Sequence, residues 1–295
     1  MSTTPTRRST TEDDITDEVL RRFEATGDPR LREIMQSLVK HLHAFVKDVN
    51  LTEEEWFKGI MFLTDTGHMC SDVRQEFILL SDTLGASMVV DLINHRKPEG
   101  ATESTVFGPF HRDGVADVEA GANIAPRDAE GQPLLISGRV LDLDGVPIVG
   151  AALDVWQSDS KGFYDQQLPP DQPYHMRGIF HSDAEGRYLI RTTRPVAYTI
   201  PDDGPVGKML RATNRHPWRP AHVHFVVSAK GFEPVTTHIF DSVDKYLESD
   251  TVFAVKESLI CDFAEHAAPD ATASKVGIAG PYASVEFDFV LKKKG

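Results

Sequence analysis

Two histidines that stand two residues apart, His222 and His224, are the side chains in this sequence best suited to bind a metal ion. They open a run that becomes apolar and β-branched, which is typical of a strand, and alternate residues of a strand point to the same face. Both imidazoles could therefore reach into one cavity, and neutral imidazole is the commonest nitrogen ligand of transition metals. Such pairs also occur as surface or core histidines, so the chemistry depends on which other ligands the chain offers.

Two tyrosines, Tyr164 and Tyr198, precede this pair in segments that read as loops. A single tyrosine is by default a packing residue whose hydroxyl is hydrogen-bonded. As a ligand, tyrosinate is a strong anionic donor, and because a phenol has a reference pKa of about 10, a metal must drive its ionisation. Ferric iron does so well. Two tyrosinates and one hydroxide would neutralise Fe(III) and leave a site that a diphenol can enter.

The composition is that of a soluble globular protein, with 295 residues of which 40% are hydrophobic and 26% charged. The formal net charge of -14 argues against nucleic acid or an anionic membrane as a partner. The two cysteines, Cys70 and Cys261, form neither a disulfide framework nor a thiolate cluster. No run approaches the roughly 18 apolar residues that a membrane span needs, and residues 1–14 do not resemble a secretory signal. We expect a cytoplasmic protein with a flexible segment over residues 1–15.

Residues 16–100 read as a series of amphipathic helices. Asp28 followed by Pro29 predicts a helix start, and apolar residues then recur at three- and four-residue spacing. Thr52 and Glu55 have the pattern of a capping box ahead of a second helix. Further helices are expected to open at Ser71-Asp72 and to run from Thr83 to Ile93. Such a layer is typical of a bundle or of a surface that contacts another subunit.

Residues 101–295 have the pattern of a β domain, because apolar runs shorten and turn residues become frequent. The sequence predicts short strands near 134–141 with a kink at Gly138, and at 151–156, 188–190, 222–227, 237–240 and 285–291. The fold class is therefore α+β, with a helical region at 16–100 and an antiparallel β-sandwich at 101–295. The long segments 157–187 and 193–220 are of the kind that carries function.

Several segments together resemble one family of enzymes. Ile136-x-Gly138-x-Val140, then Leu153-Asp154-Val155 and Gly162-Phe163-Tyr164, are similar to the signature of the intradiol ring-cleavage dioxygenases. Arg219-Pro220-Ala221-His222-Val223-His224-Phe225 is similar to the motif around that family's histidine ligands. The resemblance covers nearly the whole chain, since the helical region is like the dimerisation and linker part of the catechol-type branch. Within the family the chain is most similar to the hydroxyquinol 1,2-dioxygenases, through segments such as Asp82-Thr83-Leu84-Gly85 and Asp250-Thr251-Val252-Phe253.

The resemblance implies a site and a reaction. Tyr164, Tyr198, His222 and His224 would bind one Fe(III) per subunit, with hydroxide as a fifth ligand. A diphenol would bind as a dianion, its two protons leaving with the hydroxide and with Tyr198. The ferric ion would act as a Lewis acid toward the bound ring, which O2 then attacks at carbon. Arg219 would stabilise charge that builds on the ring, so Arg219 and Tyr198 are the catalytic candidates.

The same resemblance implies a mostly apolar substrate pocket, as a flat aromatic ring requires. Its expected walls are Leu79, Asp82, Val106, Phe107, Gly108, Pro109, Phe110, Ile200, Pro201, Arg219, His238 and Val252. Asp82 could be a helix N-cap before Thr83, or it could accept a hydrogen bond from a third substrate hydroxyl. His238 stands where catechol enzymes typically carry glutamine; it could donate a hydrogen bond or compete for the metal.

These expectations describe an enzyme that cleaves hydroxyquinol (benzene-1,2,4-triol) with O2 to a maleylacetate-type product. The helices would form a homodimer, and a phospholipid could occupy that interface. Three other interpretations remain open: the same chemistry on catechol or a chlorocatechol, a non-catalytic β-sandwich binding module, and a zinc hydrolase. The last lacks a carboxylate base at a convincing spacing from the histidine pair.

Overall fold

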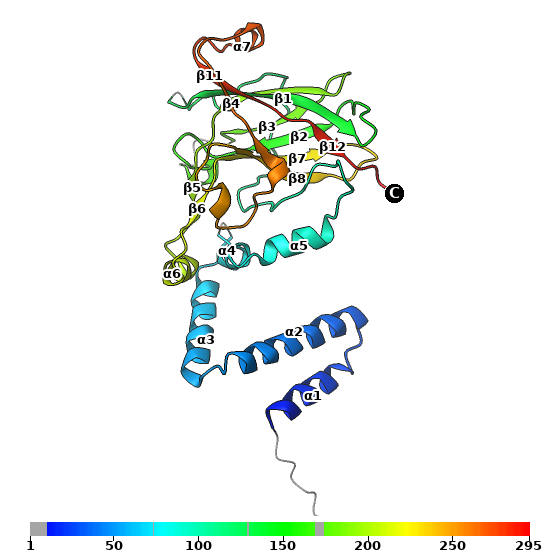
Figure 1. Cartoon of the computed structure of the whole chain (residues 1–295), viewed down its shortest axis with the longest axis vertical. Helices are drawn as coiled ribbons and strands as arrows, with labels where there is room; N and C mark the ends of the chain where they lie inside the picture. Colours follow the sequence, from blue (N-terminus) through cyan, green and yellow to red (C-terminus); the bar gives the residue numbers. More distant parts are fainter. Residues whose placement is uncertain (1–10, 73, 129, 169–173) are drawn as a thin grey trace, which may run out of the picture. The chain divides into compact units, whose positions relative to one another are not determined.

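A computed structural model of the chain describes residues 11–72, 74–128, 130–168 and 174–295. It separates into two compact units, Met1–Asp65 and Thr66–Gly295. Helices make up the first unit and strands dominate the second (Figure 1), so the α+β fold class is confirmed. The flexible segment expected at residues 1–15 lies outside the described residues as far as residue 10, and a helix begins at Glu12. The domain division expected near residue 100 stays a prediction.

The first unit contains α1 (Glu12–Phe23), α2 (Pro29–Asp48) and most of α3 (Glu53–His68). The predicted start of α2 is confirmed, since the Asp28 carboxylate accepts the first free main-chain N–H groups of that helix. The capping box of Thr52 and Glu55 is confirmed at the start of α3. Helices α1 and α2 pack together, with His43 hydrogen-bonded to Thr16.

The apolar stripe of α2 remains open to solvent within its own unit. Five side chains along it are between 46% and 54% exposed: Leu31, Ile34, Leu38, Leu42 and Phe45. No residue of α2 is classed as buried. An apolar stripe of this length normally packs against another surface, so this one is available to a further chain.

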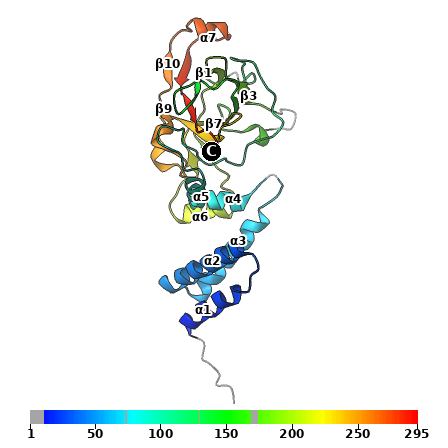
Figure 2. The same ribbon diagram turned by 90° about the vertical axis from the view of Figure 1, so that its right-hand side faces the viewer.

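Three helices of the second unit, α4 (Glu76–Thr83), α5 (Ala86–Asn94) and α6 (Pro205–Ala212), gather at one end of the β region (Figure 2). The helix expected from Ser71 begins later, because Ser71 and Arg74 exchange main-chain hydrogen bonds in a turn. The helix expected over 83–93 is wrong at its start. Gly85, with φ of 74°, ends α4 and precedes α5, since this left-handed conformation favours glycine.

Two five-stranded sheets form the rest of the second unit. One has the order β10-β11-β1-β12 with β4 also paired to β1, and the other has the order β3-β2-β7-β8-β9. Their strands are β1 (Pro133–Asp142), β2 (Ala152–Trp156), β3 (Arg177–His181), β4 (Arg187–Thr193), β7 (His222–Ser228), β8 (Val235–Asp241), β9 (Ile260–Cys261), β10 (Ala264–His266), β11 (Tyr282–Glu286) and β12 (Phe289–Leu291). A separate pair joins β5 (Tyr198–Thr199) to β6 (Trp218–Arg219). The chain also contains α7 (Ala271–Lys275) and the 3-10 turns Asp165–Gln167, Leu247–Ser249 and Glu257–Leu259.

The sheets are mixed rather than purely antiparallel. Strand β1 pairs in parallel with β11 and with β12, and β8 pairs in parallel with β9. The expected single strand 285–291 is divided, because Asp288 uses its carboxylate instead of its main chain to accept the N–H of Arg139. The kink predicted at Gly138 is confirmed, and its φ is 151°.

The core lies between the two sheets. Leu134 and Ile136 of β1 meet Val223 and Phe225 of β7 in one buried cluster. Because side chains alternate along a strand, the other face of β7 points away from this core and lies under the loops at the sheet's outer face. No helix among the described residues has both the length and the apolar character needed to cross a bilayer.

Candidate metal centre

Strand β7 places two imidazoles side by side. Val223 and Phe225 are part of the core between the sheets, so His222 and His224 occupy the opposite face of the strand, as the i, i+2 spacing predicts. Both histidines are buried, and their Nε2 atoms are 3.1 Å apart. Nδ1 of His222 lies 2.7 Å from the carbonyl oxygen of Pro220, which can only accept a hydrogen bond. The ring proton of His222 is therefore on Nδ1, and the Nε2 lone pair faces the cluster.

Two phenol oxygens complete this cluster. Tyr164 stands directly before the 3-10 turn at Asp165, and Tyr198 begins β5, whose partner strand β6 carries Arg219. The hydroxyl of Tyr164 is 2.9 Å from Nε2 of His224 and 3.2 Å from the hydroxyl of Tyr198. The two long segments of the chain thus each contribute one phenol to the outer face of β7.

The electrostatic setting favours the neutral forms of Tyr164, His222 and His224 in the protein alone. Burial raises the pKa of the Tyr164 phenol well above its usual value, and the adjacent Tyr198 raises it further. Burial lowers the pKa of His222 well below its usual value, with the charge of Arg219 as the second cause. Burial, then His238 and His222, lower the pKa of His224 in the same way. A strong cation is needed to ionise the buried phenol of Tyr164.

Arg219 lies beside the cluster as a buried positive charge. Its Nε is 3.1 Å from the Asp250 carboxylate, and one terminal nitrogen is 3.4 Å from the hydroxyl of Tyr198 and 3.1 Å from Nε2 of His222. Burial acts to lower the pKa of Arg219, but Asp250 and the two phenols outweigh it and raise the pKa. The guanidinium therefore stays charged at the edge of the cluster.

The donor set fits a single transition-metal ion. Ligand atoms that lie about 2.0–2.1 Å from a shared ion are about 3 Å from one another. The successive separations from Tyr198 through Tyr164 and His224 to His222 are 3.2, 2.9 and 3.1 Å. Two phenols and two imidazoles are hard or intermediate donors that suit ferric iron.

Comparison with known proteins gives this geometry a family. Residues 106–293 match the family model described as Dioxygenase, and residues 28–102 match the one described as Catechol dioxygenase N terminus. The chain is 52% identical over 277 residues to hydroxyquinol 1,2-dioxygenase of Rhizobium sp. (strain MTP-10005), covering 93% of each chain. The chain belongs to the intradiol ring-cleavage dioxygenases. Membership of this family implies a non-haem iron enzyme.

The chain is also similar to two further members of the intradiol dioxygenase family. The chain is 38% identical over 241 residues to catechol 1,2-dioxygenase of Candida albicans (strain SC5314 / ATCC MYA-2876), covering 80% of this chain and 78% of that one. It superposes on the solved structure of hydroxyquinol 1,2-dioxygenase from Pseudomonas putida DLL-E4 with a TM-score of 0.91 and 53% identity. That match covers 96% of this chain and 99% of the other.

Several of the expected pocket residues of this dioxygenase lie at the cluster. A Cβ atom on Gly108 would be 3.3 Å from Cε1 of His224, so the segment 106–110 runs close over the imidazole. The ring of Phe110 stacks on that of Tyr164 at 4.4 Å between centroids. Phe107 is half exposed and lies 5.8 Å from the Trp156 ring.

The remaining expected walls are more scattered. Ile200 is buried two residues after Tyr198, and the main-chain N–H of Val252 points to the Asp250 carboxylate at 3.3 Å. Leu79 and Val106 are buried, Pro201 is partly buried, and Pro109 is exposed. For these residues the structure gives a position, and their contact with substrate stays a prediction.

Asp82 is not a helix N-cap. It lies inside α4, one residue before that helix ends, and its side chain is buried. Burial raises the pKa of its carboxyl, which a hydrogen bond from Ser87 and the charge of Arg219 partly offset. The N-cap interpretation is wrong. Asp82 is a buried carboxyl under the influence of the Arg219 charge, and its contact with substrate stays a prediction.

His238 stands beside the histidine pair on the next strand. In the β7–β8 ladder it is directly opposite His224, and the two ring centroids are 4.0 Å apart. The main chain of Val106 lies close enough to the ring to act to raise the pKa of His238. Neither ring nitrogen, however, makes a hydrogen bond of ordinary geometry. Burial, followed by the positive influence of His222 and Arg219, lowers the pKa of His238 well below its usual value.

Two residues of the site were not singled out from the sequence. Trp156 at the end of β2 stacks on the His224 ring at 4.7 Å between centroids, and Asp250 holds Arg219. The signal for Trp156 is its place on the outward face of β2, because Leu153 and Val155 belong to the core. The segment Asp250-Thr251-Val252-Phe253 did stand out through the family resemblance, although without a role for its carboxylate.

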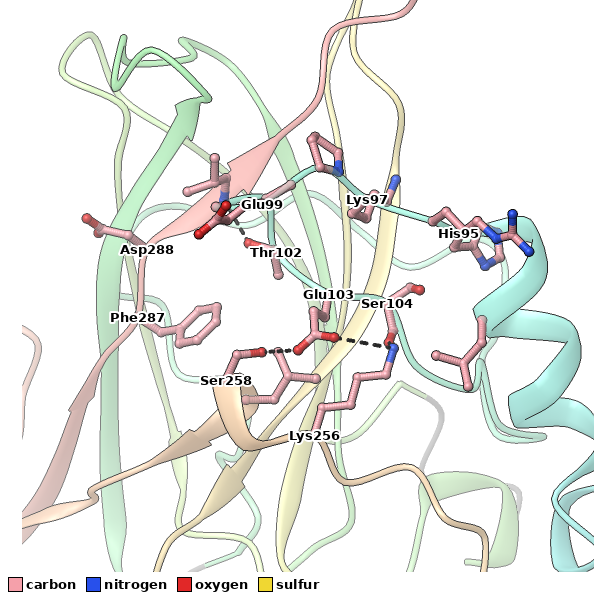
Figure 3. Close-up of a pocket in the computed structure, with 17 residues that line it drawn as sticks. His95, Lys97, Glu99, Thr102, Glu103, Ser104, Lys256, Ser258, Phe287 and Asp288 are labelled. Carbon is pink, nitrogen blue, oxygen red and sulfur yellow. Dashed lines mark hydrogen bonds and ion pairs between the residues drawn. The ribbon is translucent and has the colours of Figure 1, made fainter.

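An open pocket of about 640 Å³ lies away from the donor cluster, lined by the loop after α5 and by the segments around Lys256 and Phe287 (Figure 3). Glu103 accepts a hydrogen bond from Ser258 there, and its second oxygen is 4.0 Å from Lys256. Lys256 in turn donates to the carbonyl of Ser104 at 2.6 Å. These paired charges anchor the segment that leads into residues 106–110, and none of the expected site residues lines this pocket.

Proposed function

We propose that this dioxygenase cleaves hydroxyquinol between its adjacent hydroxyls, consuming O2 and giving 3-hydroxy-cis,cis-muconate, the enol form of maleylacetate. The observation that carries the proposal is the four-donor cluster of two phenols and two imidazoles beside the charge of Arg219. The choice of hydroxyquinol is supported by the 52% identity to an enzyme of that name, against 38% to one named for catechol.

In this proposal Tyr164, Tyr198, His222 and His224 hold one Fe(III) per subunit. The ion, when bound, supplies Lewis acidity that makes the aromatic ring reactive toward O2. Tyr198 accepts a proton from the incoming diphenol, for which its place at the edge of the cluster beside Arg219 is suited. Arg219 stabilises negative charge that develops on the ring, because its guanidinium is buried and already oriented by Asp250.

The proposed pocket recognises the third hydroxyl of hydroxyquinol through Asp82. Catechol has no hydroxyl at that position, so the carboxyl would then be buried without a substrate partner. A site built to hydrogen-bond a hydroxyl rejects an analogue that lacks it. Phe110, Ile200 and Val252, with the other apolar members of the expected walls, would hold the ring.

A visible absorption spectrum tests the metal assignment. The full-length protein reconstituted with ferric iron should show a tyrosinate-to-iron charge-transfer band, which shifts when hydroxyquinol is added without O2. Tyr164→Phe should weaken the band, whereas Tyr246→Phe, whose ring lies against Trp218, should leave it unchanged. A protein that stays colourless with ferric iron would refute the four-ligand assignment.

Parallel kinetics with hydroxyquinol, catechol and 4-chlorocatechol test the substrate assignment. Wild-type enzyme should have its highest kcat/KM with hydroxyquinol. Asp82→Asn should reduce the ratio of kcat/KM for hydroxyquinol to kcat/KM for catechol by roughly tenfold, as the loss of one hydrogen bond of about 1.4 kcal/mol implies. If wild-type enzyme preferred catechol, catechol would replace hydroxyquinol as the proposed substrate. Asp82 would then have a structural role only.

We also propose that the protein is a cytoplasmic homodimer formed through the exposed apolar stripe of α2, and that a phospholipid occupies the interface. The stripe supports this because an apolar face of its size is unfavourable in water. Light scattering should give twice the chain mass, and mass spectrometry of an organic extract should find a phospholipid. A monomer without bound lipid would contradict both.

A further inference from the structure

His238 is a buried histidine that is expected in the pocket wall but has no assigned step in the proposed reaction. It is 0% exposed, and neither ring nitrogen makes a hydrogen bond of ordinary geometry, although the main chain of Val106 is close enough to act on the ring. Buried polar atoms are nearly always well paired, so a side chain with two poorly paired nitrogens points to a missing partner. The side chain lies on the same outer face of the sheet as the two histidines of β7.

The three imidazoles together form a compact nitrogen cluster. Ligand atoms of His222, His224 and His238 all lie within 4.8 Å of one another. The pair on β7 is already at the separation that ligands of a shared ion have, with 3.1 Å between Nε2 atoms. Closing the remaining gap requires rotation of the His238 ring, which no hydrogen bond of ordinary geometry holds in place.

The charges of this cluster suit a different ion from the one proposed above. Three neutral imidazoles can bind a divalent ion without ionising anything. Engaging the phenols instead requires removing a proton from Tyr164, which is fully buried. A ferric ion is polarising enough to do so, whereas Zn²⁺ readily accepts three imidazoles and a water molecule.

We propose that His222, His224 and His238 form a second coordination set through which this chain binds Zn²⁺ or a similar divalent ion, in competition with ferric iron. Neither phenol oxygen binds the ion in this state, and the ion occupies the place of the catalytic metal. The proposal shares two histidines with the proposed iron site but does not depend on the ring-cleaving activity. A glutamine at position 238 would retain the fold's shape while removing one of the three nitrogen donors.

Metal titration of the full-length protein, stripped by a chelator, tests the proposal. We expect wild type to bind one Zn²⁺ per chain in competition with a chromogenic chelator. His238→Gln should weaken Zn²⁺ binding at least about tenfold, since even loss of an outer-shell partner costs about 10–100-fold in metal affinity. His181→Gln is the matched control, because His181 is half exposed on β3 and pairs with Asp117; its Zn²⁺ affinity should equal that of wild type.

A second variant separates the two coordination sets. Tyr198→Phe should leave Zn²⁺ affinity unchanged while it weakens ferric binding, and His238→Gln should do the reverse, keeping the ferric charge-transfer band. Unchanged Zn²⁺ affinity in His238→Gln would overturn the proposal, as would an equal loss in Tyr198→Phe. If the Zn²⁺ results are as expected but no ferric band forms, the proposed function fails and this inference stands.

X-ray absorption of the Zn²⁺-loaded wild-type protein gives an answer that needs no variant. Three imidazoles in the first coordination shell would support the proposal, and two would overturn it. This measurement decides the matter even if His238→Gln does not fold, which thermal unfolding of the metal-free variant would reveal.

Discussion

The guanidinium of Arg219 contacts Asp250 on one side and the donor cluster on the other, which requires the forked shape of an arginine side chain. Its Nε contacts Asp250 while a terminal nitrogen reaches Tyr198 and His222. A lysine at this position offers one compact charge that cannot satisfy both sides. We expect Arg219→Lys to lower kcat about 100-fold, the lower end of what one lost charge-stabilising donor costs.

Steady-state kinetics with hydroxyquinol would measure this loss, and the charge-transfer band should persist because the four donors remain. Arg219→Met should behave differently. It leaves the buried Asp250 carboxylate without its cationic partner, with only the main-chain N–H groups of Val252 and Ala254 as donors among the described residues, which costs about 3–5 kcal/mol of folding stability. Denaturant unfolding would detect this loss of stability. Equal kcat values for wild type and Arg219→Lys would exclude a catalytic role for the Arg219 guanidinium.

Asp82 is expected to reduce stability at neutral pH. Burial raises the pKa of its carboxyl above the unfolded value of 3.8, so folding disfavours the ionised form. Below pH 3.8 the group is protonated in both states and costs nothing; the cost grows as the pH rises toward the folded pKa and is constant above it. Asp82→Asn should therefore raise Tm at pH 7 by a few degrees, with the gain shrinking as the pH falls toward 3.8.

Differential scanning calorimetry of the metal-free protein at several pH values would follow this gain. A Tm difference that does not change with pH would show that the ionisation of Asp82 is not its source. The same variant is predicted to lose discrimination between hydroxyquinol and catechol, so at this position stability and selectivity oppose each other.

The elements of the chain differ in how far the sequence predicted them. Strand β7 was predicted because an apolar, β-branched run follows the histidine pair, and α2 because Asp28 and Pro29 mark its start. Helix α6 was missed, since Pro205 and Gly207 read as loop residues although proline is favoured in a first helical turn. Strand β3 was missed as well, because only its pairing with β2 distinguishes Arg177–His181 from a loop.

The candidate site was predicted better than the elements that form it. Tyr164, Tyr198, His222 and His224 were named from residue type and family pattern, and the structure brings their donor atoms together. The residues that hold these side chains and Arg219 in place were not predicted. Neither the stacking of Trp156 on His224 nor the hold of Asp250 on Arg219 follows from local sequence, because each joins segments far apart in the chain.

Gly138 allows β1 to pass close to the last strands. A Cβ atom at this position would lie 2.0 Å from the carbonyl oxygen of Phe287, and the φ of 151° is one that side-chain-bearing residues rarely adopt. We expect Gly138→Ala to destabilise the protein by about 1–3 kcal/mol through overpacking, with backbone strain adding to it. Gly145→Ala is a useful control, because it has a positive φ but no atom within 4 Å of its added Cβ.

Urea unfolding of the two variants would separate the causes. Gly138→Ala should lose more stability than Gly145→Ala, and the difference reports the clash with Phe287. Equal losses would mean that the backbone conformation alone matters, and that β1 and the segment at Phe287 can move apart without cost.

For the whole molecule, the apolar stripe of α2 decides the expected oligomeric state. Leu38 and Leu42 lie on this stripe and are each about half exposed. A charge placed there should be buried on association and would oppose it. We expect Leu38→Glu combined with Leu42→Lys to convert the dimer to a monomer at micromolar concentration, as sedimentation velocity would show. Lys40→Glu should leave the dimer intact, because Lys40 is two residues from Leu38 and from Leu42 and therefore faces away from the stripe.

The pairing of β1 has a consequence for how the protein is made. Leu134 is opposite Ala283, so strands that lie side by side are 149 residues apart in sequence (283 − 134). When the ribosome has synthesised all four candidate metal ligands, β11 and β12 have not yet been made. The edge of β1 with which they pair therefore still lacks its hydrogen-bond partners. The β region can therefore close only near the end of translation, and contacts of such long range form slowly. A nascent chain halted before residue 282 should already contain every strand of the sheet that carries the histidine pair, but it would lack β11 and β12 of the facing sheet, which complete the core behind β7. We therefore expect stable iron binding only in the finished chain.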